Sequence, residues 1–188
     1  RLEGKEMKLQ LALDEMKTEE AIKLVEKVKD YIDIIEVGTP ICLDAGNNAV
    51  ERMKKEFPDK EVLADCKIMD GGYLETENAI KAGADYVTVC AAADLLTVKG
   101  AFKATQDYGK KLVVDMITIE DIPAKVAELE EVGVDVLAVH TGADAQAVGT
   151  DVYKRQVKTR YRNCWKCDRK CRRSSCRSKS DQRSNVIN

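Results

Sequence analysis

The stretch VLADCKIMDGG, residues 62–72, decides the architecture of the chain. It begins as a short apolar run of the length of a buried strand and then places Asp65, Lys67 and Asp70 ahead of two glycines. Charged side chains at the end of a buried strand are costly unless they pair, bind a metal or take part in chemistry. Ligands of parallel α/β sheets and barrels bind at the C-terminal ends of the strands. The stretch therefore indicates a parallel sheet that carries a polar site on this rim.

Apolar runs alternate with segments of helical period on both sides of this stretch, as in repeated strand–helix units around a parallel sheet. The predicted strands are residues 8–14, 31–37, 61–67, 84–90, 111–116 and 134–140. The predicted helices between them are residues 19–29, 47–57, 73–82, 95–108 and 122–132. Helices are followed, at the position where a left-handed cap favours glycine, by Gly83, Gly109 and Gly133. These elements make six strands joined by five complete crossovers.

Charge is distributed unevenly along the chain, although the formal net charge is only −2. Residues 151–188 contain 13 Lys and Arg against 3 Asp and Glu, whereas residues 1–150 contain 18 against 30. We therefore expect an acidic folded body over residues 7–150 and a basic tail rich in cysteine, arginine and serine over residues 151–188. The acidic body argues against nucleic-acid binding, because phosphates repel it. No run reaches the roughly 18 apolar residues of a membrane span and the charged start lacks a signal-peptide core, so we expect a cytoplasmic location and no membrane partner.

The polar residues within the predicted strands gather at the strand ends. Side chains alternate along a strand, so Asp65 and Lys67 are expected to face the barrel mouth while Cys66 faces the helices, with Asp70 reaching in from the next loop. Asp14 and Glu36 end two other apolar strands and are expected to approach the same rim. Three acids and one lysine are typical of a Mg²⁺ or enediolate site, although acid–lysine pairs at strand ends can also be solvated ion pairs.

His140 is the only histidine and ends the last predicted strand. It fits either a core residue or a proton-transfer group, and the carboxylates on the same rim favour proton transfer. Cys42, Cys66 and Cys90 fit small buried residues in a reducing compartment.

The segments LQLALD, IIEVGTP, VLADCKIMDGG, GADYVTVCAAAD, VVDMI and VHTGADAQAVG resemble the orotidine-monophosphate-decarboxylase superfamily, and within it the 3-hexulose-6-phosphate synthase family. The resemblance covers residues 7–149, and its most specific part is D-x-K-x-x-D at Asp65, Lys67 and Asp70. It implies a (β/α)8 TIM barrel, of which this chain holds about six strands, and a homodimer of the full-length parent. It also implies a Mg²⁺-dependent lyase that joins formaldehyde to the sugar phosphate D-ribulose 5-phosphate, as in formaldehyde assimilation by the ribulose monophosphate pathway.

The resemblance also implies roles for individual residues. Glu36 and Asp65 would hold Mg²⁺, while Lys67 would stabilise the developing oxyanion. Asp14 and Asp70 would orient the lysine. His140 would remove the proton from the sugar, with Asp115 assisting. Because the charge of Lys67 lies at a rim, we expect Lys67→Ala to change fold stability little.

Two alternatives stay open for the chemistry and the tail. The same acids and lysine occur in 3-keto-L-gulonate-6-phosphate decarboxylase, but that family favours an arginine shortly after the histidine and a glutamate at the end of the fifth strand. The tail fits a zinc module, an RNA-binding arm containing Tyr161 and Trp165, or a joining artefact, and the artefact is favoured because codons for DVYKRQ resemble a sequencing adapter. The zinc module would use Cys164, Cys167, Cys171 and Cys176. We expect the chain as written to be inactive, because substrate phosphate binds after strands seven and eight of such barrels.

Overall fold

A computed structural model describes residues 7–134, 136–139 and 141–148. His140 and the tail over residues 151–188 lie outside the described residues, so the predictions made for them remain predictions. Among the described residues, no helix is long and apolar enough to cross a membrane. The elements, in chain order, are β1 (Gln10–Leu13), α1 (Thr18–Val28), η1 (Lys29–Tyr31), β2 (Ile34–Val37), α2 (Thr39–Ala45), α3 (Asn47–Glu56), β3 (Glu61–Ile68), α4 (Gly72–Lys81), β4 (Tyr86–Cys90), α5 (Leu95–Asp107), β5 (Lys111–Asp115), α6 (Ile122–Val132), β6 (Val136–Ala138) and α7 (Ala143–Ala147).

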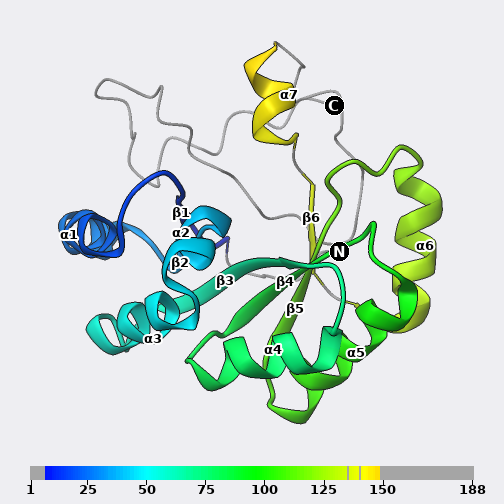
Figure 1. The fold of residues 1–188 in the computed structure, drawn as a ribbon, viewed down its shortest axis with the longest axis horizontal. Helices are drawn as coiled ribbons and strands as arrows, with labels where there is room; N and C mark the ends of the chain where they lie inside the picture. Colours follow the sequence, from blue (N-terminus) through cyan, green and yellow to red (C-terminus); the bar gives the residue numbers. More distant parts are fainter. Residues whose placement is uncertain (1–6, 135, 140, 149–188) are drawn as a thin grey trace.

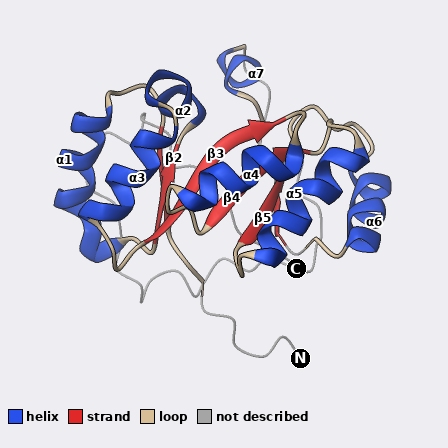
Figure 2. Ribbon diagram, turned by 60° about the horizontal axis from the view of Figure 1, so that its bottom comes forward, coloured by secondary structure: helices blue, strands red, loops and turns tan. Residues whose placement is uncertain are grey.

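The six strands form one sheet in the order β1-β2-β3-β4-β5-β6, and every neighbouring pair is parallel. The sheet is curled, and the crossover helices α1, α3, α4, α5 and α6 follow one another along its outer side (Figures 1 and 2). Consecutive parallel strands joined by helices on one side are the arrangement of a (β/α)8 barrel wall. The predicted fold class and all five predicted crossovers are therefore confirmed.

The two faces of the sheet carry different residues, because side chains alternate along each strand. Outward-facing residues such as Ile35, Ala64 and Val87 are fully buried against the helices in the main hydrophobic core. The inner face carries a smaller apolar cluster, made of Ile34, Leu63, Tyr86, Val113 and Ala138. The inner cluster forms a floor on which the residues nearer the strand ends are placed.

Element boundaries agree with the sequence prediction within two residues in most cases, and α6 matches it at both ends. The predicted strand over residues 31–37 begins later, because Tyr31 ends the short helix η1 and β2 starts at Ile34. The helix α2 was missed, since its seven residues give little helical periodicity. The predicted left-handed glycines are confirmed, with φ values of 107° for Gly83, 63° for Gly109 and 92° for Gly133.

Asp85 lies at the end of the sheet opposite the polar rim and connects elements there. Its Oδ2 accepts hydrogen bonds from Lys54 Nζ at 2.9 Å and from the backbone N–H of Val62 at 3.0 Å, while its Oδ1 accepts from Lys110 Nζ at 2.7 Å. Burial alone would raise the pKa of Asp85, but the hydrogen bonds from Lys110 and Lys54 outweigh it and hold this pKa below its usual value. One carboxylate thus joins α3 to the starts of β3 and β5.

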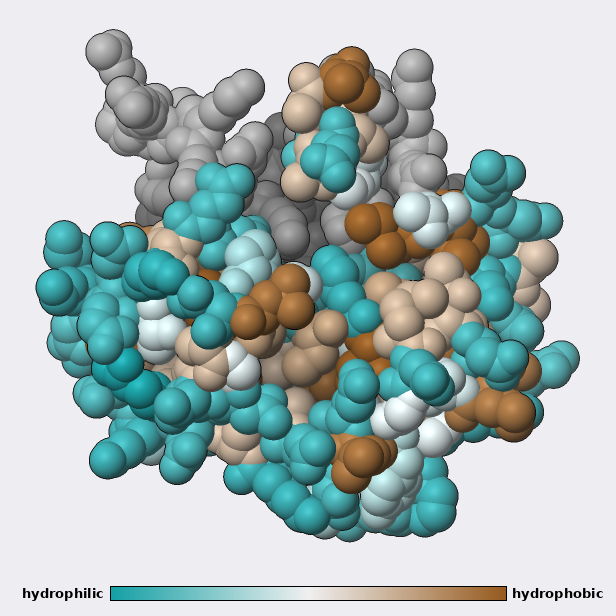
Figure 3. Space-filling view, viewed as in Figure 1, coloured by the Kyte–Doolittle hydropathy of each residue, from teal (hydrophilic) through white to brown (hydrophobic). Residues whose placement is uncertain are grey.

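The helices α4 and α5 approach closely at glycines. A Cβ atom on Gly72 would lie 2.0 Å from the carbonyl oxygen of Thr97, and one on Gly100 would lie 3.1 Å from the backbone nitrogen of Tyr73. The two glycines therefore allow α4 and α5 to pack closely against each other. The outer surface over the helices is mostly hydrophilic, with apolar residues in separate small patches (Figure 3).

Candidate active site

A polar layer lies above the apolar floor on the inner face of the sheet. Each strand from β2 to β5 places its next inward residue two positions after a floor residue, as the alternation of side chains requires. The residues at these positions are Glu36, Asp65, Thr88 and Asp115. All four are almost completely buried, with exposures of 3%, 2%, 4% and 1%. Three carboxylates and one hydroxyl therefore converge where the strands end.

Lys67 lies between two of these carboxylates. Its Nζ is 3.1 and 3.0 Å from the two carboxylate oxygens of Asp65 and 2.7 Å from Oδ2 of Asp115. The side chains of Asp65 and Asp115 are 3% and 2% exposed, whereas that of Lys67 is 24% exposed. Lys67 is thus the only one of these three residues whose side chain is appreciably exposed.

Two threonine hydroxyls complete the surroundings of Asp65. Thr88 Oγ1 donates to Asp65 Oδ1 at 2.9 Å, and Thr39 Oγ1 lies 2.9 Å from Oδ2 and 2.8 Å from the carbonyl oxygen of the same residue. Together with the contacts from Lys67, each carboxylate oxygen has two donors within hydrogen-bond distance. The contacts from these three side chains fix the orientation of the Asp65 carboxylate, and the single proton of Thr39 is shared between Oδ2 and the carbonyl oxygen.

The charges of the cluster are mutually stabilised. Burial by itself would raise the pKa of Asp65, but the Lys67 ammonium and the hydrogen bonds from Lys67, Thr88 and Thr39 outweigh it, so this pKa lies below its usual value. Burial would lower the pKa of Lys67, but the charges of Asp65 and Asp115 and their hydrogen bonds raise it above its usual value. The two carboxylates therefore hold Lys67 in its charged form at neutral pH.

The backbone of Lys67 departs from regular strand geometry. Its φ of 47° is in the left-handed region, and the pairing of β3 with β4 shifts register between Ala64 and Ile68. The N–H of Lys67 donates to Thr88 Oγ1 at 2.9 Å, and its carbonyl oxygen accepts from Cys90 Sγ at 3.5 Å. Side chains of β4 thus take the place of ladder hydrogen bonds at this residue.

Comparison with known proteins assigns the chain to a family. The family model described as orotidine 5′-phosphate decarboxylase / HUMPS matches residues 7–187. The chain belongs to this family. A 3-hexulose-6-phosphate synthase of Bacillus subtilis is 47% identical over 148 residues, which are 79% of this chain and 70% of that relative.

Two solved structures extend the comparison. The crystal structure of 3-hexulose-6-phosphate synthase from Salmonella typhimurium has a TM-score of 0.77 at 53% identity and covers 79% of this chain and 70% of that chain. The 3-keto-L-gulonate-6-phosphate decarboxylase from Vibrio cholerae has a TM-score of 0.72 at 27% identity and covers 77% of this chain and 67% of that chain. The two relatives at about half identity are both named 3-hexulose-6-phosphate synthase, which is a lyase-type aldolase.

The family's D-x-K-x-x-D element is only partly assembled as the sequence predicted. Asp65 and Lys67 face the same side, and Cys66 packs with the outer core, as expected. Asp70 does not flank the ammonium, because it is exposed and its Oδ1 accepts from the N–H of Gly71 at 2.7 Å. The second carboxylate beside Lys67 is Asp115, which the sequence had suggested only as an assistant.

Glu36 and Asp14 lie on the neighbouring strands at the same rim. Glu36 Oε2 accepts from Gln10 Nε2 at 2.6 Å. Asp14 is half-buried just after β1, and a Cβ on Gly38 would lie 2.4 Å from its Oδ1. Only glycine at this position lets the carboxylate of Asp14 lie against the end of β2. Of the three acids predicted to converge, Glu36 and Asp65 lie in the buried polar layer together with Asp115, and Asp14 lies at its edge.

Three contributors to the site were not predicted from the sequence: Gln10, Thr39 and Thr88. Thr88 could have been predicted, since it faces inward two residues after an apolar residue of its strand, as Asp65 and Asp115 do. Thr39 is the first residue of α2, and Pro40 after it marks a helix start. The neutral hydroxyl of Thr88 in an apolar strand carries no obvious chemical signal, and Thr39 was not predicted because its short helix was missed.

The donor set can be compared with what Mg²⁺ requires. Among the described residues, no group of three or more His, Cys, Asp or Glu side chains is arranged to hold a metal ion. Mg²⁺ commonly uses only one or two protein carboxylates and completes its shell with water and substrate oxygens. Glu36 and Asp65, as oxygen donors on adjacent strands, fit such a two-carboxylate site, provided that Asp65 exchanges one of its hydrogen bonds for the ion.

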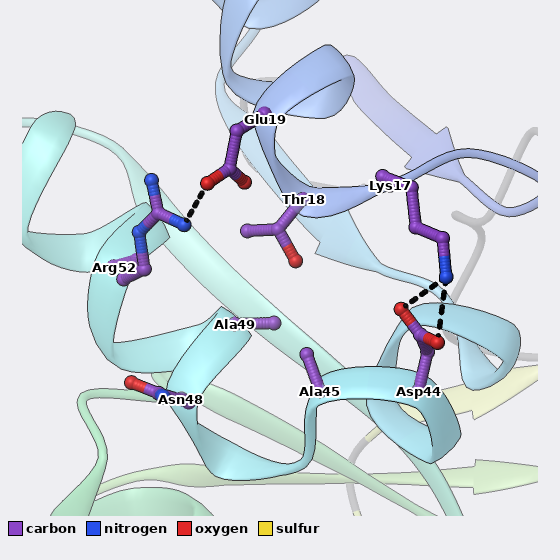
Figure 4. A pocket seen from close by; sticks show the side chains of 8 residues that line it. All are labelled: Lys17, Thr18, Glu19, Asp44, Ala45, Asn48, Ala49 and Arg52. Carbon is purple, nitrogen blue, oxygen red and sulfur yellow. Dashed lines mark hydrogen bonds and ion pairs between the residues drawn. The ribbon is translucent and has the colours of Figure 1, made fainter.

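A separate hollow of about 340 Å³ lies on the outer surface between the start of α1, the end of α2 and α3 (Figure 4). Its four charged side chains are paired with one another, Lys17 with Asp44 at 2.8 Å and Arg52 with Glu19 at 2.7 Å. None of the predicted site residues lines it. The predicted site residues therefore lie away from this hollow, and those that the structure describes are at the rim of the sheet.

Proposed function

We propose that this protein joins formaldehyde to D-ribulose 5-phosphate in an aldol addition that gives D-arabino-hex-3-ulose 6-phosphate. The observation that carries the proposal is the Lys67 cation, held between Asp65 and Asp115 at the strand ends. A fixed positive charge beside an otherwise acidic, buried layer is suited to stabilise an enediolate oxygen. The identity of about half to synthases, against 27% to a decarboxylase structure, supports the same choice.

Each residue of the cluster has a defined part in this proposal. Lys67 places its ammonium at the oxygen that becomes negative when the sugar loses a proton. Asp65 and Asp115 hold the ammonium in place and keep it charged. His140, which lies outside the described residues, is proposed as the base that removes the proton. The enediolate carbon then forms the new bond with formaldehyde, whose oxygen takes up a proton.

Magnesium is part of the proposal. Glu36 and Asp65 would hold the ion. When bound, Mg²⁺ supplies Lewis-acid polarisation of the sugar carbonyl. Asp14, at the edge of the acidic layer, is proposed to orient groups at the rim.

A homodimer of the full-length parent remains part of the proposal. Several large apolar side chains that follow the strand ends are exposed, and such residues are common in subunit contacts. They are Leu43, Met69, Leu74 and Leu96, at 83%, 53%, 61% and 78% exposure. Gel filtration coupled to light scattering would measure the molecular mass, and a strictly monomeric parent would contradict a dimer.

Decarboxylation of 3-keto-L-gulonate 6-phosphate is the second candidate, because two carboxylates and a lysine can also stabilise the enediolate formed by loss of CO₂. Two features of the sequence favour the synthase: β5 ends in Asp115 and not in glutamate, and Thr141, Gly142, Ala143 and Asp144 provide no arginine after His140.

An assay of the purified protein with each sugar phosphate tests the assignment. We expect formaldehyde consumption that depends on D-ribulose 5-phosphate and is lost when a chelator removes the divalent ion, with no CO₂ release from 3-keto-L-gulonate 6-phosphate. CO₂ release without formaldehyde consumption would contradict the proposed synthase activity and support the decarboxylase activity. The chain of 188 residues and a form extended to the length of its relatives should be assayed side by side, since we expect activity only from the extended form.

A further inference from the structure

The left-handed backbone of Lys67 is a strained conformation for a residue with a side chain. With φ at 47°, it lies in a region that non-glycine residues adopt at a cost and keep only where neighbouring groups hold them. The register shift between β3 and β4 falls at the same place, so ordinary strand pairing does not provide that support. Other groups must therefore fix the direction in which Lys67 leaves the strand.

Thr88 provides this support with a single oxygen atom. Its Oγ1 accepts from the N–H of Lys67 at 2.9 Å and donates to Asp65 Oδ1 at 2.9 Å. A hydroxyl has one proton and two lone pairs, so both bonds form together and each restricts the direction of the other. Thr88 is only 4% exposed, which keeps water from replacing either bond.

Cys90 continues the same pattern two residues along β4. Its thiol is directed to the carbonyl oxygen of Lys67 at 3.5 Å, a longer and weaker contact than those of Thr88. The inward side chains of β4 thus bond both backbone groups of Lys67, and the hydroxyl of Thr88 is the stronger of the two supports.

We propose that Thr88 is a positioning residue for the reaction, which acts by locking the backbone of Lys67 and the carboxylate of Asp65 to one another. The proposal rests on the proposed function for its catalytic consequence but not for its structural part. Without the hydroxyl, the ammonium and the carboxylate remain present while their relative placement loosens. Small misplacements of catalytic groups lower turnover more than they lower binding.

Backbone amide hydrogen exchange, read residue by residue by NMR, tests the structural part on the 188-residue chain. In Thr88→Val, which has nearly the same shape, the Lys67 amide should exchange about tenfold faster, because its acceptor is lost. Thr88→Ser keeps the hydroxyl and should restore slow exchange. Thr88→Cys, with a weakly bonding thiol, should give an intermediate rate and serves if the valine variant does not fold.

Thr76→Val is the matched control. Thr76 in α4 is fully buried, and within the described part of the chain its hydroxyl has no hydrogen-bond partner. The same chemical change there should leave exchange at Lys67 as in the wild type. Wild-type exchange in Thr88→Val or Thr88→Cys, or equal acceleration in Thr76→Val, would overturn the proposal.

Turnover of the extended form tests the catalytic part. Thr88→Val should lower kcat by about ten- to a hundredfold with KM for the sugar phosphate little changed, and Thr88→Ser should recover most of the loss. A folded valine variant with wild-type kcat would reduce Thr88 to a structural residue. If the wild-type extended form consumes no formaldehyde while the exchange results hold, the proposed function fails and the positioning of Lys67 by Thr88 stands.

Discussion

The ammonium group of Lys67 is the counter-charge of two carboxylates that have almost no access to water. Asp65 and Asp115 are both more than nine-tenths buried, so neither can exchange the lysine for solvent. An unpaired charge in such a place is much more costly than one at a solvated rim. The burial of both acids therefore changes the expectation, made from the sequence, that removal of Lys67 would leave the fold nearly unaffected.

Lys67→Ala should impair both activity and stability. We expect turnover of the extended form to fall by about a hundredfold or more, the usual scale for loss of a preorganised oxyanion partner. The free energy of unfolding should fall by about 3 kcal/mol, because two buried carboxylates lose their partner. Enzyme assays and urea denaturation measure the two effects. Lys103→Ala, which removes an exposed partner of Asp107, is the control and should resemble the wild type.

The site residues that could be predicted from the sequence are those whose residue type itself indicates chemistry. Asp65 and Lys67 were assigned to one side because side chains alternate along a strand. The choice between Asp70 and Asp115 as the second carboxylate could not be made in the same way, because Asp115 lies 48 residues further along and meets Lys67 only through the curl of the sheet. The contact of Thr88 with the backbone of Lys67 depends on the register shift between β3 and β4, and the sequence does not reveal where that shift falls.

At the scale of elements, the Asp85 junction holds α3 and the starts of two strands together. Asp85→Asn should lower the free energy of unfolding by about 1 to 2 kcal/mol, since charged hydrogen bonds to two partly exposed lysines are lost. Urea denaturation at neutral pH measures this change. Asp107→Asn removes a carboxylate from an exposed pair on α5 and is the matched control. If the Asp85 variant and this control were equally stable, the hydrogen bonds of Asp85 would not stabilise the fold as expected.

The contact between α4 and α5 depends on the absence of a side chain at Gly72. Gly72→Ala would place a methyl group 2.0 Å from the carbonyl oxygen of Thr97, so the two helices must separate. We expect a loss of about 3 kcal/mol from overpacking. Gly109→Ala meets no atom within 4 Å and should cost about 1 kcal/mol, from its left-handed backbone alone. Thermal unfolding of both variants compares them, and a larger loss at Gly109 would be the contrary result.

Long elements were predictable because they repeat a pattern over enough residues. The helices α1, α3, α4, α5 and α6 each extend over ten or more residues, and their positions agreed with the prediction. The missed helix α2 has seven residues and α7 has five, which is too few for a period of 3.6 residues to stand out. The omission mattered for the site, because α2 carries Thr39.

For the whole molecule, the charge clusters at the two ends of the sheet set the dependence of stability on pH. The pKa values of Asp65 and Asp85 are lowered in the folded state, so their contribution is complete above an unfolded pKa of about 3.9 and is lost as pH falls through the folded values. The pKa of Lys67 is raised, so its contribution is complete below an unfolded pKa of about 10.4 and is lost as pH rises through the folded value.

We therefore expect a plateau of stability between about pH 5 and pH 9, with a decline on either side. Urea denaturation of the wild type from pH 2 to pH 11 would trace the curve. In Asp85→Asn the decline below pH 4 should be shallower, because one carboxyl with a lowered pKa has been removed. An acid decline identical in shape to that of the wild type would show that Asp85 does not contribute to it.

The parallel sheet itself was the most predictable feature of the molecule. Strand–helix alternation repeated over 140 residues leaves few other arrangements, since each crossover is long enough to return the chain to the same edge. The curl of the sheet, by contrast, depends on inward packing of residues from five strands, and no local pattern reports it.

The strand order has a consequence for how the protein is made. Every strand from β2 to β6 pairs with the strand that precedes it in the chain, so none must wait for a segment not yet synthesised. A strand emerging from the ribosome finds its template edge already present, and the crossover helix just completed covers the outer face of that edge. The sheet can thus be assembled in the direction of translation, one unit at a time, and the lysine on β3 meets its second carboxylate only after the fifth strand has been added.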